Sequence, residues 1–277
     1  MEKTLFIFGF GYSARALARL LRDEFIIIGT SREAGDGVIQ WPDTDISVPL
    51  SRATHLLISA GPDTDGDPVL RQVRDEIAQI APQLQWVGYL STTGVYGDHQ
   101  GGWVDEETPL APSTKRGHQR VEAEAAWQEL AVETGLPLHI FRLAGIYGPG
   151  RGPFAKVRRG TARRIIKKNQ VFSRIHVDDI AQVLAASIAA PNPGRIYNVC
   201  DDLAAPPEDV LAHAADLLGV PHPPAEDFET AEMTPMARSF YAESKRVRND
   251  RIKGELSVKL LYPTYRDGLA ALLKAEG

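Results

Sequence analysis

A glycine-rich turn near the start of the chain has the spacing of a pyrophosphate-binding loop. Gly9, Gly11 and Ala14 follow a short apolar run and directly precede a segment with helical periodicity. The first glycine permits a tight turn, the second lets the backbone approach a phosphate, and the small third residue lets helix and strand pack closely. Free N–H groups of the helix N-terminus then point at the phosphates. The turn predicts a dinucleotide site that also includes Tyr12 and Ser13.

The residues about twenty positions further along bear on the choice of dinucleotide. NAD-binding sites usually carry a carboxylate there, which binds the ribose 2′-hydroxyl. This chain has Ser31 and Arg32, followed by Glu33. A guanidinium can donate two charge-assisted hydrogen bonds to a 2′-phosphate. We therefore predict NADP, with NAD left open by the neighbouring glutamate. In the alternative interpretation Arg32 is a solvated loop charge.

Five segments, taken in order, resemble the extended short-chain dehydrogenase/reductase superfamily, the group of nucleotide-sugar epimerases and dehydratases. They are residues 90–97, 104–109, 142–150, 174–180 and 197–199. The resemblance covers roughly residues 4–200 and implies a nicotinamide cofactor. It places Leu143 beside the nicotinamide, and Thr92 at the position of the catalytic Ser/Thr. Ser59 and Ala60, at the end of another apolar run, are further cofactor candidates, because dinucleotides bind at the carboxyl ends of strands.

The chain departs from the family at the catalytic Tyr-x-x-x-Lys pair. Arg116 stands where the resemblance expects the tyrosine, and Arg120 where it expects the lysine. The atypical, YeeZ-like branch of the superfamily lacks the standard catalytic set in this way. Proton transfer needs a group whose pKa can approach the working pH, whereas a guanidinium stays protonated. Thr92, Arg116 and Arg120 are therefore candidate catalytic residues that act by hydrogen bonding and charge.

Residues 151–174 hold nine basic side chains and no acidic one, in a chain whose net charge is −5. One interpretation is a clamp for an anionic substrate, with Arg151 and Arg174 as ligands. The other is a solvated helix face. Tyr96 is a third candidate substrate ligand, and its alternative role is packing within its own loop. We expect no metal site, because His176 and the aspartates after it suit the first turn of a helix.

The spacing of apolar residues predicts the elements that position these groups. Short apolar runs predict strands at residues 4–8, 25–29, 38–41, 55–59, 86–90, 138–143 and 196–199. Helical periodicity lies between them at residues 13–22, 69–80, 114–133 and 177–190. This alternation predicts an α/β Rossmann fold, a doubly wound parallel sheet with a small C-terminal substrate lobe. We expect a cofactor domain at residues 1–150 and a lobe at residues 151–277, interleaved with the last sheet elements.

Composition excludes several other classes of protein. The acidic net charge argues against a nucleic-acid-binding surface. No apolar run approaches the roughly 20 residues that span a bilayer. The single Cys200 excludes an internal disulfide and fits a reducing cytoplasm.

Together these features predict an NADP(H)-binding oxidoreductase or epimerase/dehydratase-like enzyme for an unidentified anionic small molecule. The alternative is a catalytically silent NADP-binding sensor or regulatory module. The two differ in turnover, because a sensor would bind the cofactor without consuming it. The family resemblance also implies a homodimer.

Overall fold

A parallel seven-stranded sheet forms the centre of the molecule. The computed structural model describes residues 2–33, 35 and 37–276. The strands follow the order β11-β7-β5-β4-β1-β2-β3, and neighbouring strands run parallel. They are β1 (Thr4–Phe8), β2 (Ile26–Ser31), β3 (Val38–Gln40), β4 (His55–Ile58), β5 (Trp86–Thr92), β7 (Leu138–Leu143) and β11 (Ile196–Val199). This order confirms the predicted doubly wound α/β fold.

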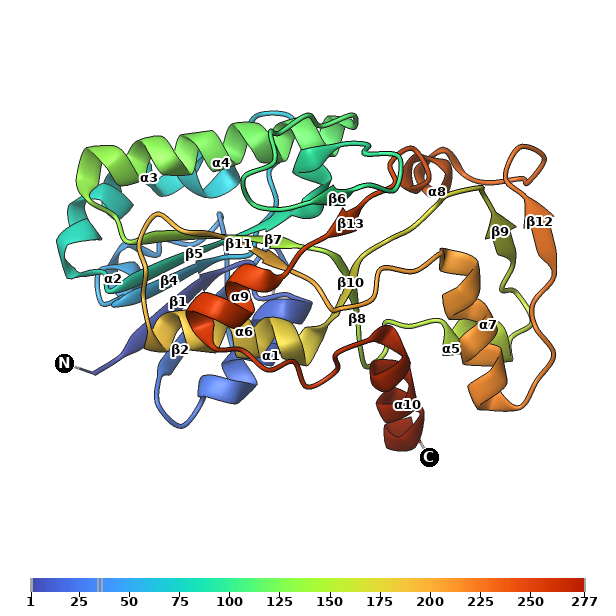
Figure 1. Ribbon diagram of the computed structural model, residues 1–277. Coiled ribbons are helices and arrows are strands. Elements are labelled where there is room, and N and C mark those ends of the chain that lie inside the picture. Colours follow the sequence, from blue (N-terminus) through green and yellow to red (C-terminus); the bar gives the residue numbers. More distant parts are fainter. Residues whose placement is uncertain (1, 34, 36, 277) are drawn as a thin grey trace.

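Helices cover both faces of the sheet, and a smaller lobe extends to one side (Figure 1). Leu5 and Ile7 of β1 belong to the core beneath α1 and α6, whereas Phe6 and Phe8 belong to the core beneath α3 and α4. Alternate side chains of a strand point to opposite faces, so a strand buried on both sides is an unbroken apolar run. The helices of these layers are α1 (Tyr12–Leu21), α2 (Ser47–Leu50), α3 (Pro68–Ile80), α4 (Lys115–Thr134) and α6 (Val177–Ala189).

The smaller lobe has a core of its own, which includes Tyr147, Phe154 and Tyr265. Three two-stranded pieces, β8 with β10, β9 with β12 and β6 with β13, join distant parts of the chain. The remaining strands are β6 (Trp103–Val104), β8 (Gly145–Tyr147), β9 (Arg164–Ile166), β10 (Arg174–His176), β12 (Ala225–Asp227) and β13 (Arg246–Val247). The remaining helices are η1 (Ala81–Gln83), η2 (Thr93–Tyr96), α5 (Phe154–Arg158), α7 (Pro207–Leu218), α8 (Pro235–Phe240), α9 (Asp250–Leu256) and α10 (Tyr265–Glu276).

The strands of the central sheet and the four predicted helices match the predicted ranges to within a few residues, whereas the short paired strands outside that sheet and the helices α7 and α10 had no predicted range. A strand of two or three residues has no periodicity to detect, and its partner lies far away in the sequence, as with Trp103 and Arg246. The division into residues 1–150 and 151–277 stays a prediction, because α6 and β11 come from the second part and belong to the sheet layer of the first.

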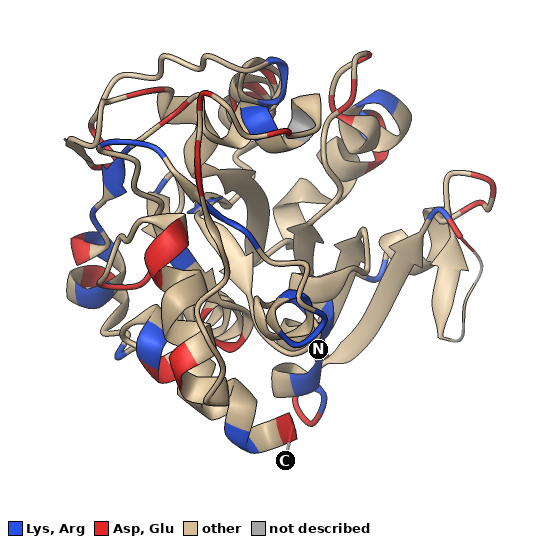
Figure 2. Ribbon diagram, turned by 90° about the vertical axis from the view of Figure 1, so that its right-hand side faces the viewer, with Lys and Arg blue, Asp and Glu red and all other residues tan. Residues whose placement is uncertain are grey.

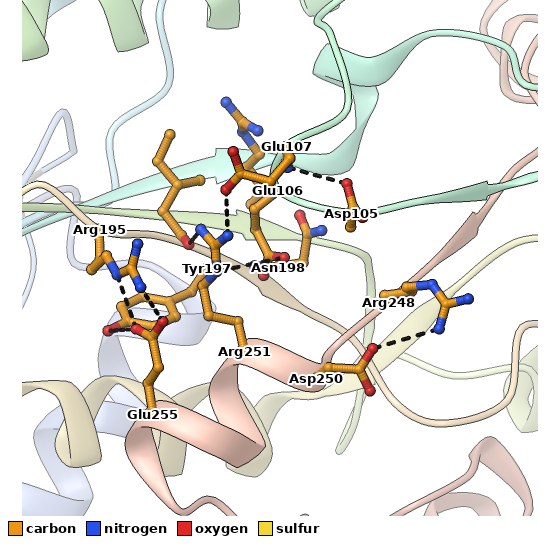
Figure 3. Close-up of polar contacts among 12 residues, drawn as sticks. Asp105, Glu106, Glu107, Arg195, Tyr197, Asn198, Arg248, Asp250, Arg251 and Glu255 are labelled. Atoms are coloured by element: carbon orange, nitrogen blue, oxygen red, sulfur yellow. Dashed lines mark hydrogen bonds and ion pairs between the residues drawn. The ribbon is translucent and has the colours of Figure 1, made fainter.

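Helix α9 ties the end of the chain back to the central sheet (Figure 3). Arg251 donates hydrogen bonds to the backbone oxygen of Ile196 (3.1 Å) and to Glu107 (2.5 Å). Glu255 accepts a hydrogen bond from the hydroxyl of Tyr197 (3.3 Å). These contacts hold the returning C-terminal segment against β11 and against the loop that follows β6.

A buried ion pair joins α4 to β7. The side chains of Arg142 and Glu124 are 3% and 2% exposed, and the guanidinium donates to both carboxylate oxygens, at 3.2 and 2.7 Å. Arg142 also donates to the hydroxyl of Tyr96 (2.9 Å), which in turn donates to the side chain of Asn198 (2.8 Å). The backbone N–H of Asn198 donates to Glu106 (2.8 Å). One polar network therefore connects α4, β7, η2, β11 and the loop after β6.

Replacing Glu124 by alanine should strongly destabilise the protein. The change leaves the buried guanidinium of Arg142 without its carboxylate, which typically costs about 3–5 kcal/mol. Urea denaturation should show the loss in the free energy of unfolding. The control is Glu122→Ala, on an exposed position of the same helix, which should change that free energy by less than about 0.5 kcal/mol. Equal effects of the two substitutions would contradict this account.

Two carboxylates are buried where the small lobe meets the sheet. Burial raises the pKa of Asp201 to about 8, although the nearby charge of Arg174 lowers it. Within the described structure Oδ2 of Asp201 has no hydrogen-bond partner. Burial also raises the pKa of Asp179 to about 6, even though its carboxylate accepts hydrogen bonds from the backbone N–H groups of Leu261 and Tyr262. In both groups burial makes the protonated form more favourable in the folded protein than in water.

Asp201 should contribute less and less to stability as the pH rises from about 4 to about 8. In that window folded Asp201 keeps a proton that the unfolded chain releases, so its contribution to the free energy of unfolding falls with pH. Asp201→Asn should raise the thermal midpoint at pH 8 and leave it nearly unchanged at pH 4. The exposed Asp23→Asn serves as a control. The same gain at both pH values would show that ionisation of Asp201 is not the cause.

Candidate functional site

A cleft of about 1010 Å³ opens at the carboxyl ends of the central strands. Its walls include Ser13 at the start of α1, Ser59 after β4, Thr92 at the end of β5 and Leu143 at the end of β7. The order of the strands reverses between β1 and β4, and such a switch point is where doubly wound sheets bind their ligands.

The glycine-rich turn has two glycines with different constraints. Gly9 has a φ of +84°, and a Cβ there would lie 2.7 Å from the backbone nitrogen of Ala60, so the fold itself requires glycine. A Cβ on Gly11 would meet only the carbonyl oxygen of Gly9, at 3.9 Å, so the space beside Gly11 is open. The fold does not need glycine at that position, but a ligand lying against the backbone does.

The start of α1 is suited to an anion. Its N-cap is Gly11, which offers no side-chain cap, and the first turn holds no acidic residue. By contrast, Asp67 caps α3 and Thr114 caps α4 through side-chain hydrogen bonds. The first N–H groups of a helix have no partner within the helix and carry partial positive charge. At α1 those groups lie next to Ser13 on the cleft wall, so the predicted turn fits a pyrophosphate.

Tyr12 and Arg151 lie together at this end of the cleft. The hydroxyl of Tyr12 donates to the carbonyl oxygen of Pro149 (2.9 Å), and the guanidinium of Arg151 lies 5.7 Å from the centre of the tyrosine ring. Burial raises the pKa of Tyr12, and the nearby Arg151 partly offsets this. Arg151 is exposed and lines the cleft, whereas Tyr12 borders it through this stacking contact.

The residues predicted to recognise a 2′-phosphate lie outside the cleft wall. Ser31 ends β2, and its hydroxyl accepts a hydrogen bond from the N–H of Glu33 (3.3 Å). The side chain of Arg32 is exposed. The N–H of Phe10, inside the glycine turn, donates to the carbonyl oxygen of Thr30 (2.7 Å), so the ends of β1 and β2 are adjacent. Recognition of NADP by these residues stays a prediction.

The three candidate catalytic residues all line the cleft. The hydroxyl oxygen of Thr92 accepts a hydrogen bond from the N–H of Gly94 (3.2 Å), which leaves its own hydrogen free to be donated. Arg120 is fixed, because Nη1 donates to the carbonyl oxygen of Leu90 (2.5 Å) and to the hydroxyl of Tyr89 (3.2 Å). Arg116 is exposed and makes no hydrogen bond or ion pair within the described residues.

Of the three candidate substrate ligands, the cleft wall includes Arg151 and Arg174 but not Tyr96. Arg174 lines the cleft, and its Nη1 donates to the carbonyl oxygens of Phe172 (2.9 Å) and Ala205 (3.0 Å). Burial lowers the pKa of Arg174. Tyr96 does not line the cleft. It is fully buried, and its hydroxyl donates to Asn198 and accepts from Arg142. The assignment of Tyr96 as a substrate ligand is therefore corrected, and the alternative role in packing holds.

Most side chains of the basic segment are engaged in contacts within the protein. Arg158 pairs with Glu276 (2.5 Å), and Arg163 pairs with Glu226 (2.9 Å). Figure 2 shows basic and acidic residues interspersed over the outer helices rather than gathered by sign. Of the nine basic residues in the segment, the described cleft wall includes Arg151 and Arg174. The segment as a whole is therefore not a clamp, but these two members face the cleft.

The C-terminal part of the chain supplies cleft residues that sequence reasoning missed. Lys245 is 8% exposed, and its Nζ donates to the carbonyl oxygen of Gly97 and to Glu243, both at 2.6 Å. The other carboxylate oxygen of Glu243 accepts from the hydroxyl of Ser113 (2.6 Å). Glu243 and Lys245 both line the cleft, beside Phe240. No motif marks these residues, because the pairing of β13 with β6 brings them to the site.

Metal and membrane features are missing from the part of the chain that the structure describes. Within residues 2–33, 35 and 37–276 no group of three or more His, Cys, Asp or Glu side chains could hold a metal ion. Across the same residues no helix has the length and apolar composition that would cross a membrane.

Comparisons with known proteins agree with this geometry. The model of the NAD dependent epimerase/dehydratase family matches residues 76–200. Protein YeeZ of Escherichia coli (strain K12) is 32% identical over 189 residues, which is 65% of each chain, so the match spans just under two thirds of that relative.

Two solved structures extend the comparison to the whole chain. A conserved protein of unknown function from Silicibacter pomeroyi DSS is 59% identical, with a TM-score of 0.94 and 99% of both chains covered. UDP-glucuronic acid 4-epimerase from Bacillus cereus, in complex with NAD, has a TM-score of 0.77 over 98% of this chain and 99% of its own, at 15% identity, and shows the shared fold. The chain is therefore similar to protein YeeZ over 65% of its length, and residues 76–200 are similar to the NAD dependent epimerase/dehydratase family.

Proposed function

We propose that this protein binds NADP(H) and acts as an oxidoreductase or an epimerase/dehydratase-like enzyme on an unidentified anionic metabolite. The observation that carries the proposal is the uncapped start of α1, which opens on the same cleft as Thr92, Arg116 and Arg120. The NAD complex of the Bacillus cereus epimerase, which shares the fold, supports a nicotinamide cofactor.

Each candidate cofactor residue would have its own role in binding the dinucleotide. Gly11 and Ser13 would hold the pyrophosphate with the backbone of α1, and Ser59, Ala60 and Leu143 would lie along the rest of the dinucleotide. The hydroxyl of Ser31 and the guanidinium of Arg32 would bind a 2′-phosphate. The cofactor would supply the hydride, while the side chains of this chain bind and orient the reacting groups.

The charge of the cleft supports an anionic substrate. Six basic side chains and one acidic side chain line it, although the whole chain is acidic. They are Lys115, Arg116, Arg120, Arg151, Arg174, Lys245 and Glu243. The carboxylate of Glu243 pairs with Lys245, which leaves the other five basic side chains without a carboxylate partner within the described residues. A cleft lined with one sign of charge concentrates ligands of the opposite sign.

The arginines at positions 116 and 120 also favour a second candidate, a catalytically silent sensor. Neither side chain can release a proton at neutral pH. An enzyme would oxidise bound NADPH when given a suitable carbonyl compound, whereas a sensor would bind the cofactor and change its affinity for a partner with redox state. Spectrophotometric turnover with a panel of carbonyl compounds separates the two candidates. The proposed homodimer is tested by light scattering on the purified chain.

Arg32→Ala should remove a preference for NADP(H) over NAD(H). Losing hydrogen bonds to a charged phosphate typically costs about 1.5–3 kcal/mol, and NAD(H) affinity should stay the same. Calorimetric titration of both cofactors measures the difference. Arg22→Ala, just beyond the opposite end of α1, is the matched control. Equal affinity of the unmodified protein for both cofactors would remove the assignment of NADP.

Gly11→Val should abolish cofactor binding while leaving the protein folded. The side chain would enter open space where the pyrophosphate is proposed to lie, and the φ of −91° at this position suits any residue. Gly9→Ala should instead lower the thermal midpoint, because its Cβ meets the backbone of Ala60. Gly254→Ala, which has free space around its Cβ and lies in α9, is the control and should not lower the thermal midpoint. If Gly11→Val still binds NADPH normally, the pyrophosphate lies elsewhere.

A further inference from the structure

We propose that the cleft holds an anionic group of the substrate, a carboxylate or a phosphate, beside Thr92, and that Arg116 and Lys245 bind it together. The inference rests on the proposed function and deepens it, because it assigns the anionic group to one end of the cleft and to two named side chains. Lys245 comes from the C-terminal segment, outside the residues that resemble the superfamily.

Arg116 stands in an electrostatic conflict that a bound anion would relieve. The first turn of α4 contains Lys115 and Arg116 and no acidic residue. The N-terminus of a helix carries partial positive charge, so basic side chains are unfavourable there and acidic ones are favourable. The exposed guanidinium of Arg116 has no partner within the described residues, and it lines the cleft. Such departures from local rules concentrate at functional sites.

Lys245 offers a nearly buried ammonium with one donor to spare. An ammonium has three N–H groups, and two of them are used by Gly97 and Glu243. Each carboxylate oxygen of Glu243 accepts one hydrogen bond, Oε2 from Lys245 and Oε1 from Ser113. The carboxylate is therefore held in place on both of its oxygens. Burying an ion pair costs desolvation energy that the pairing barely recovers, so stability alone does not explain this pair.

Lys245 and the start of α4, which carries Arg116, both pack against the short turn η2. Lys245 bonds to Gly97 directly after η2, and Thr92 bonds to Gly94 inside it. On the side of α4, a Cβ on Gly117 would lie 3.0 Å from the carbonyl oxygen of Gly94, so the residue after Arg116 packs against that turn. The hydrogen bond from Ser113 to Glu243 joins the segment that carries Lys245 to the start of α4, because Ser113 directly precedes that helix.

The groups that face this end of the cleft are rich in donors. Thr92 has a free hydroxyl hydrogen, and Arg116 and Lys245 have only N–H groups to offer. Ser91, which is 4% exposed and also lines the cleft, has a hydroxyl with no partner in the described structure. A carboxylate or phosphate has only acceptors and can satisfy all four groups. A guanidinium matches the geometry of both anions.

Calorimetry with oxalate and inorganic phosphate as probes tests the inference on the protein saturated with NADP⁺ and, separately, on the protein without cofactor. At least one probe should bind with one-to-one stoichiometry. Arg116→Gln and Lys245→Gln should each weaken that binding by at least about tenfold, the usual size of a lost hydrogen bond to a charged group. Lys156→Gln, an exposed position outside the cleft, is the control for the same change of charge.

Lys245→Arg is the second variant, for the case that Lys245→Gln fails to fold. It keeps a cation at the buried position and should retain most of the probe affinity. The stronger probe identifies the anion as a carboxylate or a phosphate. Absence of binding by both probes, or an affinity that survives Arg116→Gln, overturns the inference. If NADP⁺ binds and the probes do not, the proposed cofactor function stands alone. If the probes bind in the expected way and NADP⁺ does not, the anion site stands and the cofactor assignment fails.

Discussion

The buried pair of Arg142 and Glu124 is the constraint on which the cleft depends. Glu124 lies two turns along α4 from Arg116, and Arg142 directly precedes Leu143, at the end of β7. Through Tyr96 the same guanidinium reaches the turn that follows Thr92. One charged network thus sets the relative positions of a helix, a strand and a turn that each supply part of the wall. Because a bidentate pair has a defined geometry, it limits how far these elements can slide past one another.

The second constraint is the return of the C-terminal segment to the sheet. Arg251 reaches Glu107 and the backbone of β11, while β13 pairs with β6. These contacts join residues far apart in the chain and place Glu243 beside Ser113, just before α4, and Lys245 beside Gly97. The cofactor half of the cleft is built from consecutive strand-and-helix units, whereas the opposite half is assembled from segments that meet only in the folded protein.

That difference explains how far the sequence could predict the site. The turn at Gly9 and Gly11 is local, and its interpretation follows from the strand before it and the helix after it, so it could be recognised from the sequence, although its role as a cofactor site stays a prediction. The surroundings of Tyr96 and Arg158 depend on distant partners, Asn198 and Glu276, and no local pattern records those. Lys245 was missed for the same reason. The sequence can indicate the role of a residue when that role depends on its neighbours in the chain. It cannot do so when the role depends on contacts with distant segments.

The arginines at positions 116 and 120 do more than remove a proton-transfer pair, because they also add permanent charge to the cleft. A tyrosine beside a lysine can hold or release a proton, whereas a guanidinium provides a permanent charge and a rigid set of donors. In this chain the guanidinium of Arg120 donates to the backbone of β5, whereas that of Arg116 has no partner within the described residues. The fixed one takes part in shaping the wall, and the free one adds charge to a cleft that is already basic. If the proposed function holds, these arginines would replace a site organised around proton transfer with one that holds an anion next to the nicotinamide.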